Sequence, residues 1–197
     1  MAQVRKNFDW VVKAAEGAAL GTGTRMEYEV IHGLYNVMPN EPLAELMYKN
    51  LKLVGGVKYN EEERAFAEKI IPTLGKDGVN PEDAEKISPY TVSYKGRGGS
   101  TDVGDISWVV PTAGLRTATW VPGTGAHSWQ AVAAGGTTIG TKGMMVAAKT
   151  LALTAIDIYQ DPKICDTAKE ALAGRRGKNF KYEPLLGDRK PPLDYRK

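Results

Sequence analysis

Residues 96–130 carry the side chains of this chain that could do chemistry. Two glycine-rich stretches there present polar groups, the first with Thr101 and Asp102 and the second with His127, one of the two histidines in the sequence. Residues 115–121 between them are β-prone, which predicts a strand with a polar loop at each end. In parallel α/β sheets, ligand-binding groups lie on loops beyond the strand ends, so we expect a site here.

On the residues alone, His127 has two interpretations. An isolated histidine beside an apolar run is more often a hydrogen-bonded structural residue than a ligand. A catalytic zinc site takes about three protein ligands, and a two-metal site needs a bridging carboxylate besides. Two histidines with no pair at helical spacing exclude the HExxH arrangement. Any metal site in this chain is therefore incomplete or uses acidic ligands.

The glycines of residues 96–104 also invite comparison with a phosphate-binding loop. No Lys-Ser or Lys-Thr pair follows the last glycine, and no apolar strand precedes the first. We therefore predict no nucleotide binding.

Composition and charge narrow the class of protein. A chain of 197 residues, 42% apolar and 25% charged, has the size and composition of one globular domain. The net charge of +3 is modest and no basic patch is interleaved with aromatic residues, so we expect no nucleic-acid partner. The N-terminus lacks an apolar signal core, and Lys149 and Asp157 interrupt the most apolar stretch, residues 144–158. We therefore expect a cytoplasmic protein without a membrane span. Cys165, the single cysteine, cannot form an internal disulfide.

The elements that must position this stretch are mainly helices. Apolar residues at helical spacing predict helices over residues 4–15, 43–54, 60–71 and 141–159. Asn40 and Asn60 suit the N-caps of the second and third, and Glu63 stands at capping-box spacing from Asn60. Residues 24–31 alternate between apolar and polar, which predicts a half-buried strand. Residues 76–95 have no periodic face and predict a long surface loop.

The predicted fold class is α/β. We expect a parallel-rich sheet that contains residues 115–121, covered by the helix over residues 141–159, with the first helix and strand in a separate small unit. In this arrangement, Asp102 and His127 lie at the same edge of the sheet.

Three segments in order, STDVGDISW, GTGAHSWQ and KGMMVAAKT, give the chain a family resemblance. They occupy residues 100–108, 123–130 and 142–150. The chain resembles the C-terminal part of the M20 family of metal-dependent amidohydrolases and peptidases, and within it the B-type subunit of the aminobenzoyl-glutamate hydrolases. Gln130 stands where some relatives have a glutamate, which leaves the subgroup open.

The resemblance implies a division of the chain. Residues 34–197 would form the C-terminal part of an M20-type catalytic domain, with a parallel-rich sheet and flanking helices. Residues 1–33 would be the remnant of a lid domain that mediates dimerisation. An apolar helix face at Phe8, Val11 and Val12 without partner strands is expected to recruit a second chain, so we predict a homo-oligomer.

The resemblance also implies roles for individual residues. His127 corresponds to the last metal ligand of a two-zinc site, whose other ligands and general-base glutamate come from an upstream half. Thr101, Asp102 and Asp105 correspond to a loop that faces the site and positions the substrate or supports the metal ligands. Gly125 would let the backbone approach the substrate. A capped turn explains the first three equally well, and tight-turn geometry alone could explain the glycine.

The implied activity is zinc-dependent hydrolysis of the amide bond of a small acyl- or aminobenzoyl-amino acid. Two zinc ions would polarise the carbonyl and activate a bridging water. We expect this activity of the intact protein, with this chain alone inactive. The alternative is a non-catalytic fragment or interaction module that retains the fold without the reaction.

Overall fold

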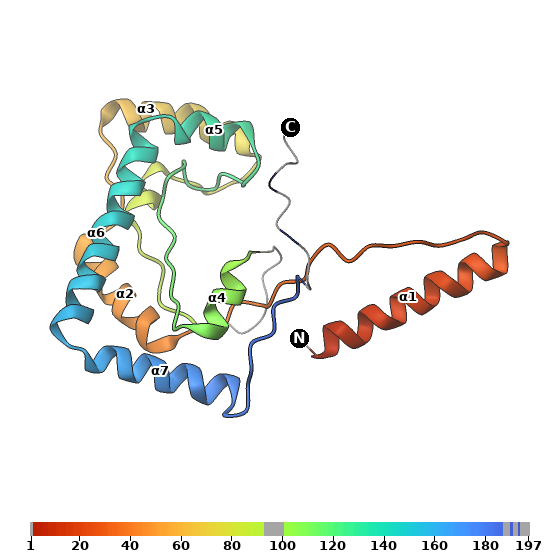
Figure 1. Ribbon diagram of the computed structural model, residues 1–197. Helices are drawn as coiled ribbons and strands as arrows, with labels where there is room; N and C mark the ends of the chain where they lie inside the picture. Colours follow the sequence, from red (N-terminus) through yellow and green to blue (C-terminus); the bar gives the residue numbers. More distant parts are fainter. Residues whose placement is uncertain (1, 93–100, 187–189, 191–192, 194–197) are drawn as a thin grey trace. The chain divides into compact units, whose positions relative to one another are not determined.

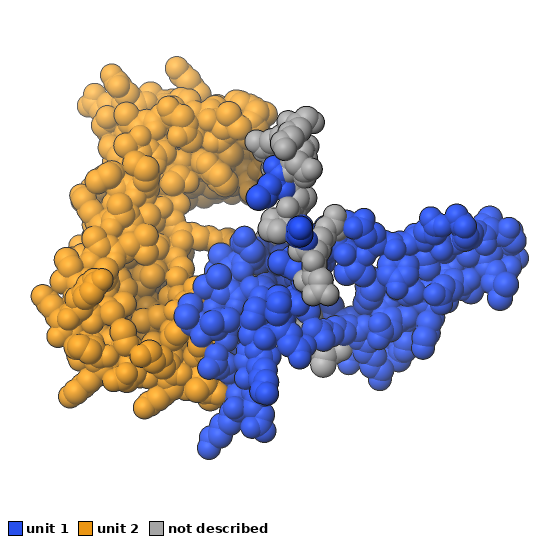
Figure 2. All heavy atoms as spheres, in the orientation of Figure 1, with its two compact units in different colours: residues 1–38, 97–110, 176–197 blue, residues 39–96, 111–175 orange. Residues whose placement is uncertain are grey.

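The computed structural model describes residues 2–92 and 101–186, together with Lys190 and Leu193 (Figure 1). These residues fall into two compact units (Figure 2). Unit 1 takes its residues from Met1–Met38, Arg97–Val110 and Arg176–Lys197, and unit 2 takes its residues from Pro39–Gly96 and Pro111–Arg175. The predicted domain boundary after residue 33 stays a prediction.

The predicted α/β fold class is wrong, because the residues that the structure describes form helices and no β-strand. Residues 24–31 and 115–121, both predicted as strands, have no regular secondary structure. Alternating or β-prone residues favour extended backbone, but a strand also needs a neighbour with which to form a ladder of backbone hydrogen bonds. No such ladder is formed within the described ranges, and the expected sheet edge is therefore absent from them.

Unit 1 contains a long N-terminal helix with little packing around it. Helix α1, Ala2–Thr22, leaves large apolar side chains exposed, among them Phe8, Val11 and Leu20. Residues 24–39 follow as an extended arm, and Tyr28 on this arm meets the ring of Phe8 edge-on at 6.1 Å. The apolar face that the sequence predicted is thus largely exposed.

The rest of unit 1 is built around the short helix α4, Val103–Val109. The ring of Trp108 lies 5.3 Å from that of Tyr35 and 4.8 Å from that of Phe180. Gly104 lies so close to the carbonyl oxygen of Tyr35 that a Cβ there would overlap it. This aromatic cluster joins three parts of the chain that are distant in sequence.

Unit 2 holds the remaining helices. They are α2 (Glu41–Val54), α3 (Glu61–Ile70), the 3-10 turns η1 (Ile71–Leu74) and η2 (Pro81–Glu85), α5 (Trp129–Gly135), α6 (Thr138–Gln160) and α7 (Lys163–Arg176). Helix α2 packs along α6 (Figure 1). The Nδ2 atom of Asn50 on α2 donates to Asp157 Oδ2 at 2.8 Å and to Thr154 Oγ1 at 3.2 Å, both on α6.

The two predicted N-caps, Asn40 and Asn60, are confirmed. Asn40 Oδ1 accepts the backbone N–H of Leu43 at 3.3 Å, and Gly55, with φ 84°, ends α2. Asn60 and Glu63 form the predicted capping box, with donor–acceptor distances of 2.8 and 2.9 Å. These contacts satisfy backbone groups that a helix end otherwise leaves without partners.

The core of unit 2 gathers Ala67, Ile70, Val121, Ala134 and Ile139. Four of these residues lie on helices, and Val121 ends the extended stretch that precedes the loop of His127. The start of that loop is therefore fixed in the core.

Helix α6 buries a different face from the one that its apolar residues predict. Met144 is 56% and Leu151 48% exposed, whereas Gly143 and Thr150 are buried. The carbonyl of Ala118 and a methyl of Thr119 lie directly against Gly143, where a Cβ would stand 2.5 Å from the carbonyl oxygen of Ala118. The small residues are buried because they allow this close approach.

No helix within the described ranges is both long and apolar enough to cross a membrane.

Candidate functional site

His127 lies on the loop of residues 122–128, which joins the core residue Val121 to α5. The loop begins with a turn in which the N–H of Thr124 donates to the carbonyl of Val121 at 3.1 Å. Gly123 has φ 81° and His127 has φ 59°; among the described non-glycine residues, only His127 has a positive φ. Left-handed backbone costs an ordinary L-residue about 1–2 kcal/mol, so the surrounding contacts must hold it.

The end of the loop is held by Ser128. Its hydroxyl donates to the carbonyl of Gly125 at 2.7 Å and accepts the backbone N–H of Ala131 at 3.2 Å. The same side chain therefore caps α5 and closes the turn that contains His127, whose imidazole is exposed. Gly125 is also exposed, and no atom lies within 4 Å of the point where a Cβ on it would stand.

A second group of predicted site residues lies in unit 1 at the start of α4. Thr101 Oγ1 accepts the backbone N–H of Val103 at 3.3 Å, which is a turn-forming bond. Asp102 precedes the helix, is exposed and makes no side-chain capping bond. Both residues thus lie at the start of α4, where Thr101 forms a turn and Asp102 forms no cap.

Asp105 is engaged inside unit 1. Its Oδ2 accepts the backbone N–H of Tyr35 at 3.2 Å, and its Oδ1 accepts the hydroxyl of Tyr182 at 2.9 Å. The hydrogen bond to this carboxylate raises the pKa of Tyr182, since it favours the protonated phenol. Asp105 therefore ties together the arm, α4 and the C-terminal stretch.

The structure brings the predicted site residues together in two groups. Gly125 and His127 share one loop of unit 2, and Thr101, Asp102 and Asp105 share the start of α4 in unit 1. That the two groups serve one site stays a prediction.

The donor set was tested for its fit to zinc. Across residues 2–92 and 101–186, no three His, Cys, Asp or Glu side chains gather in a way that could hold a metal ion. The exposed imidazole of His127 fits the chemistry of one ligand, but a catalytic zinc ion needs about three. These described residues by themselves do not complete a zinc site.

Tyr59 and Glu63, elsewhere in unit 2, also have shifted pKa values. Burial, and secondarily the charge of Glu63, raises the pKa of Tyr59 to about 12. Burial also acts to raise the pKa of Glu63, but hydrogen bonds from Lys142, Thr138 and the backbone of Asn60 hold it below its ordinary value. Lys142 Nζ lies 2.5 Å from Glu63 Oε2. This pair fixes α6 to the start of α3.

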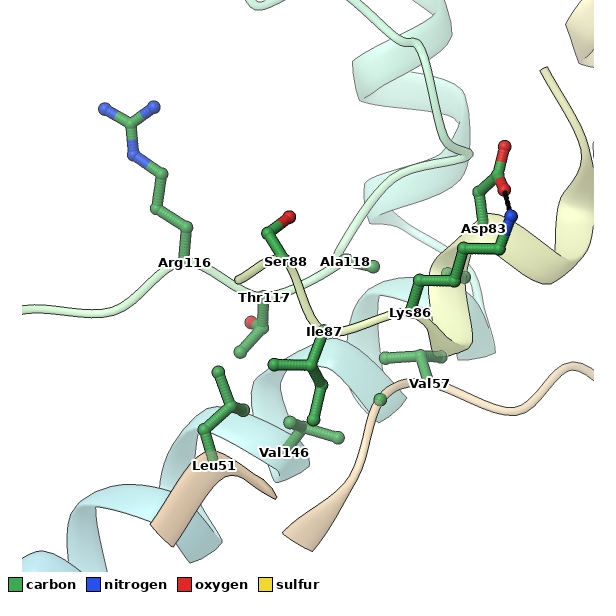
Figure 3. Close-up of a pocket in the computed structure, with 12 residues that line it drawn as sticks. Leu51, Val57, Asp83, Lys86, Ile87, Ser88, Arg116, Thr117, Ala118 and Val146 are labelled. Atoms are coloured by element: carbon green, nitrogen blue, oxygen red, sulfur yellow. Dashed lines mark hydrogen bonds and ion pairs between the residues drawn. The ribbon is translucent and has the colours of Figure 1, made fainter. Parts of the chain in front are cut away.

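Unit 2 also has a surface hollow of about 270 Å³ (Figure 3). Its apolar lining includes Leu51, Val57, Ile87 and Val146, whereas the side chain of Arg116 extends away from the others. None of the five predicted site residues lines it. Asp83, Lys86, Ser88 and Thr117 add polar side chains to the lining of this apolar floor.

Comparison with curated proteins found two relatives. The chain is 35% identical to the B-type subunit of the p-aminobenzoyl-glutamate hydrolase of Escherichia coli (strain K12) over 184 residues, which cover 82% of this chain and 38% of the relative. It is 28% identical to the Xaa-Arg dipeptidase of Mus musculus over 172 residues, which cover 84% of this chain and 32% of the relative. The chain belongs to the M20 family.

The matched part of this M20 chain spans 38% of the length of the first relative and 32% of the length of the second. A scan against protein-family models found no match, and no solved structure matches. The two curated relatives nevertheless confirm the family resemblance that the sequence motifs predicted. The roles of individual residues in an M20 site stay predictions.

Tyr35 and Lys142, which bond Asp105 and Glu63, had no role predicted from the sequence. Tyr35 is 70 residues from Asp105, and Lys142 is 79 residues from Glu63. The capping-box pattern identified Glu63 as a cap residue, but no local pattern identifies a partner at such a separation.

Proposed function

We propose that this chain is the C-terminal part of an amidohydrolase that cleaves the amide bond of a small acyl- or aminobenzoyl-amino acid. The observation that carries the proposal is the 35% identity, over most of the chain, to a protein named as an aminobenzoyl-glutamate hydrolase subunit. The second relative is named as a Xaa-Arg dipeptidase, which is also the name of a hydrolase. An aminobenzoyl-glutamate-like compound is the substrate that we propose.

Within this function, we assign His127 as one ligand of a zinc ion. Its imidazole is exposed, and its strained backbone is held by the loop, which is a common feature of functional positions. The other ligands and the general base would come from outside these residues, in the intact protein. By itself the chain is then expected to be inactive.

The other four predicted site residues differ in their exposure to solvent, and we propose different roles for them on that basis. Thr101 and Asp102 are exposed at the start of α4, and Gly125 is exposed beside His127, so we propose that these three contact the substrate. Asp105 already accepts two hydrogen bonds, and we propose that it supports the substrate-binding loop by holding α4 in place.

An exchange experiment tests the proposal. The matched segment of the Escherichia coli relative is replaced by this chain, and the purified protein is assayed for zinc by mass spectrometry and for aminobenzoyl-glutamate hydrolysis by chromatography. We expect hydrolysis that His127→Ala abolishes with loss of bound zinc. His32→Ala, which removes the other exposed histidine, is the matched control and is expected to leave both unchanged.

Two results would contradict the proposal. Hydrolysis that survives His127→Ala would remove the zinc-ligand assignment. A well-folded exchanged protein that binds no zinc and cleaves no amide would favour the non-catalytic alternative, an interaction module that keeps the fold.

We also propose that the chain forms a homo-oligomer through α1. Phe8 is 45% and Val11 65% exposed, and clustered apolar side chains of this size favour association. Sedimentation velocity at micromolar concentration should show a dimer or larger species, and Phe8→Glu with Val11→Glu should shift it to the monomer. A monomer before substitution would contradict this association.

A further inference from the structure

The loop that carries His127 and the first turn of α5, which follows it, are both anchored to one short stretch of unit 2, residues 73–76. Lys76 Nζ donates to the carbonyl oxygen of Gly123 at 2.7 Å. On the other side, Gln130 Nε2 donates to the backbone oxygen and to the hydroxyl of Thr73, each at 3.2 Å. The anchored residues lie four positions before and three positions after His127.

The stretch that receives these anchors is itself fixed. The hydroxyl of Thr73 donates to the carbonyl of the core residue Ile70 at 2.7 Å. Gly75, with φ 60°, ends η1 in a left-handed turn that brings Lys76 round to the loop. Leu74 packs against the core. The anchors therefore connect the loop to the most buried part of unit 2.

Gly123 adds a packing contact to its hydrogen bond. A Cβ at this position would stand 3.0 Å from a methyl of Val79 and 3.4 Å from a methyl of Leu74, so the backbone of the loop lies against these side chains. With φ 81°, the residue also needs the freedom of glycine. The start of the loop is thus held by shape as well as by Lys76.

These contacts explain how an exposed residue can keep an uncommon backbone conformation. His127 has φ 59°, and within the loop the hydroxyl of Ser128 closes the turn through the carbonyl of Gly125. The chain is fixed before the loop by the core residue Val121 and after it by α5, and the two anchors further restrict the seven residues between these points. Removal of either anchor should let the loop relax and let the imidazole point in many directions.

We propose that Lys76 and Gln130 are positioning residues, which hold the loop of residues 122–128 so that the His127 imidazole is presented in one orientation. The proposal rests on the proposed function of His127 as a metal ligand. Neither residue is assigned a contact with substrate or metal, since Lys76 bonds the loop backbone at Gly123 and Gln130 bonds Thr73 from the first turn of α5. Partners that orient a ligand typically change metal affinity or activity by about 10–100-fold when they are removed.

The chemistry at position 130 favours an amide over a carboxylate. Gln130 donates to a backbone carbonyl oxygen, which an ionised glutamate cannot do. A carboxylate would instead face the oxygen of Thr73 with like partial charge. Gln130→Glu therefore tests the anchor with almost no change in side-chain volume.

The experiment uses the 197-residue chain, labelled with ¹⁵N and ¹³C, without added metal. The variants are Lys76→Met and Gln130→Glu, and the matched controls are Lys69→Met and Gln160→Glu at exposed helical positions. Backbone order parameters of residues 124–127 are measured, together with the Cα shift and the HN–Hα coupling of His127. These last two values report its left-handed conformation.

We expect order parameters of about 0.8 in the unmodified chain and in both controls, and values below about 0.6 in each anchor variant. The left-handed signature of His127 should average out in the same two variants. Lys76→Arg retains a donor and should restore both readouts. Order parameters in α3 and α6 should not change, which separates loss of the anchor from loss of the fold.

The outcomes distinguish this proposal from the function on which it rests. Unchanged order parameters and an unchanged His127 signature in both anchor variants would overturn the positioning role, whatever His127 does. If the anchor variants loosen the loop but the exchanged Escherichia coli protein hydrolyses its substrate without His127, the zinc-ligand assignment fails and the anchoring of the loop stands.

Discussion

Substitution of Gly143 by alanine tests the packing that sets the start of the His127 loop. The added Cβ would stand 2.5 Å from the carbonyl oxygen of Ala118 and 2.8 Å from a methyl of Thr119, well inside the 3.4 Å at which ordinary contact begins. The backbone oxygen cannot rotate away, so the segment that leads to Val121 must move. Overpacking of this kind costs about 1–3 kcal/mol.

A gain in helix propensity offsets part of this cost. Alanine inside a helix is about 0.5–1 kcal/mol more favourable than glycine, so we expect Gly143→Ala to lower the free energy of unfolding of unit 2 by about 1–2 kcal/mol. Gly174→Ala on α7 is the matched control, because no atom lies within 4 Å of its added Cβ. That variant should gain about 0.5–1 kcal/mol.

Urea unfolding followed by circular dichroism measures both changes. The midpoint should fall for Gly143→Ala and rise for Gly174→Ala. A Gly143→Ala chain as stable as the Gly174→Ala chain would refute the close contact between α6 and residues 118–119. It would also remove the structural reason for the buried face of α6.

Three further outcomes are expected. The pKa of Tyr59 is raised from 10.0 to about 12, so the free energy of unfolding should fall by about 1 kcal/mol, after allowance for partial exposure, as the pH rises from 10 to 12. The titration is measured by difference absorbance against Tyr59→Phe. A phenol that titrates near 10 would contradict the burial of Tyr59. The pKa of Glu63 is lowered, so the stability that its carboxylate contributes is present above about pH 4.5 and is lost as the pH falls below it. Lys142→Met should lower the free energy of unfolding by about 1–3 kcal/mol and move the midpoint of acid unfolding to higher pH. An unchanged acid midpoint would contradict the ion pair of Lys142 and Glu63. Gly104→Ala should detach α4 from Tyr35 and increase hydrogen exchange across α4, whereas unchanged exchange would contradict this contact.

Local chemistry let several features be predicted from sequence. Asn40, Asn60 and Glu63 were identified as helix-start residues because a cap needs only a side chain and a backbone N–H three residues apart. The glycine turn that presents His127 was predicted for the same reason, since its conformation is set by adjacent residues. The three motifs also identified the M20 family, which the two relatives confirm.

Only the tertiary structure decided three features that depend on residues distant in sequence: strand formation, the buried face of α6 and the anchor of the His127 loop. Residues 115–121 have the composition of a strand, yet no ladder forms on them within the described ranges, because a ladder requires a second extended segment in register. The apolar residues of α6 predicted the wrong buried face, since the close approach of Ala118 to Gly143 decides which side packs. Likewise, the bond from Lys76 to Gly123 spans 47 positions. Spacing along the chain determines caps and turns, but only the folded chain determines which distant backbone atoms a side chain can reach.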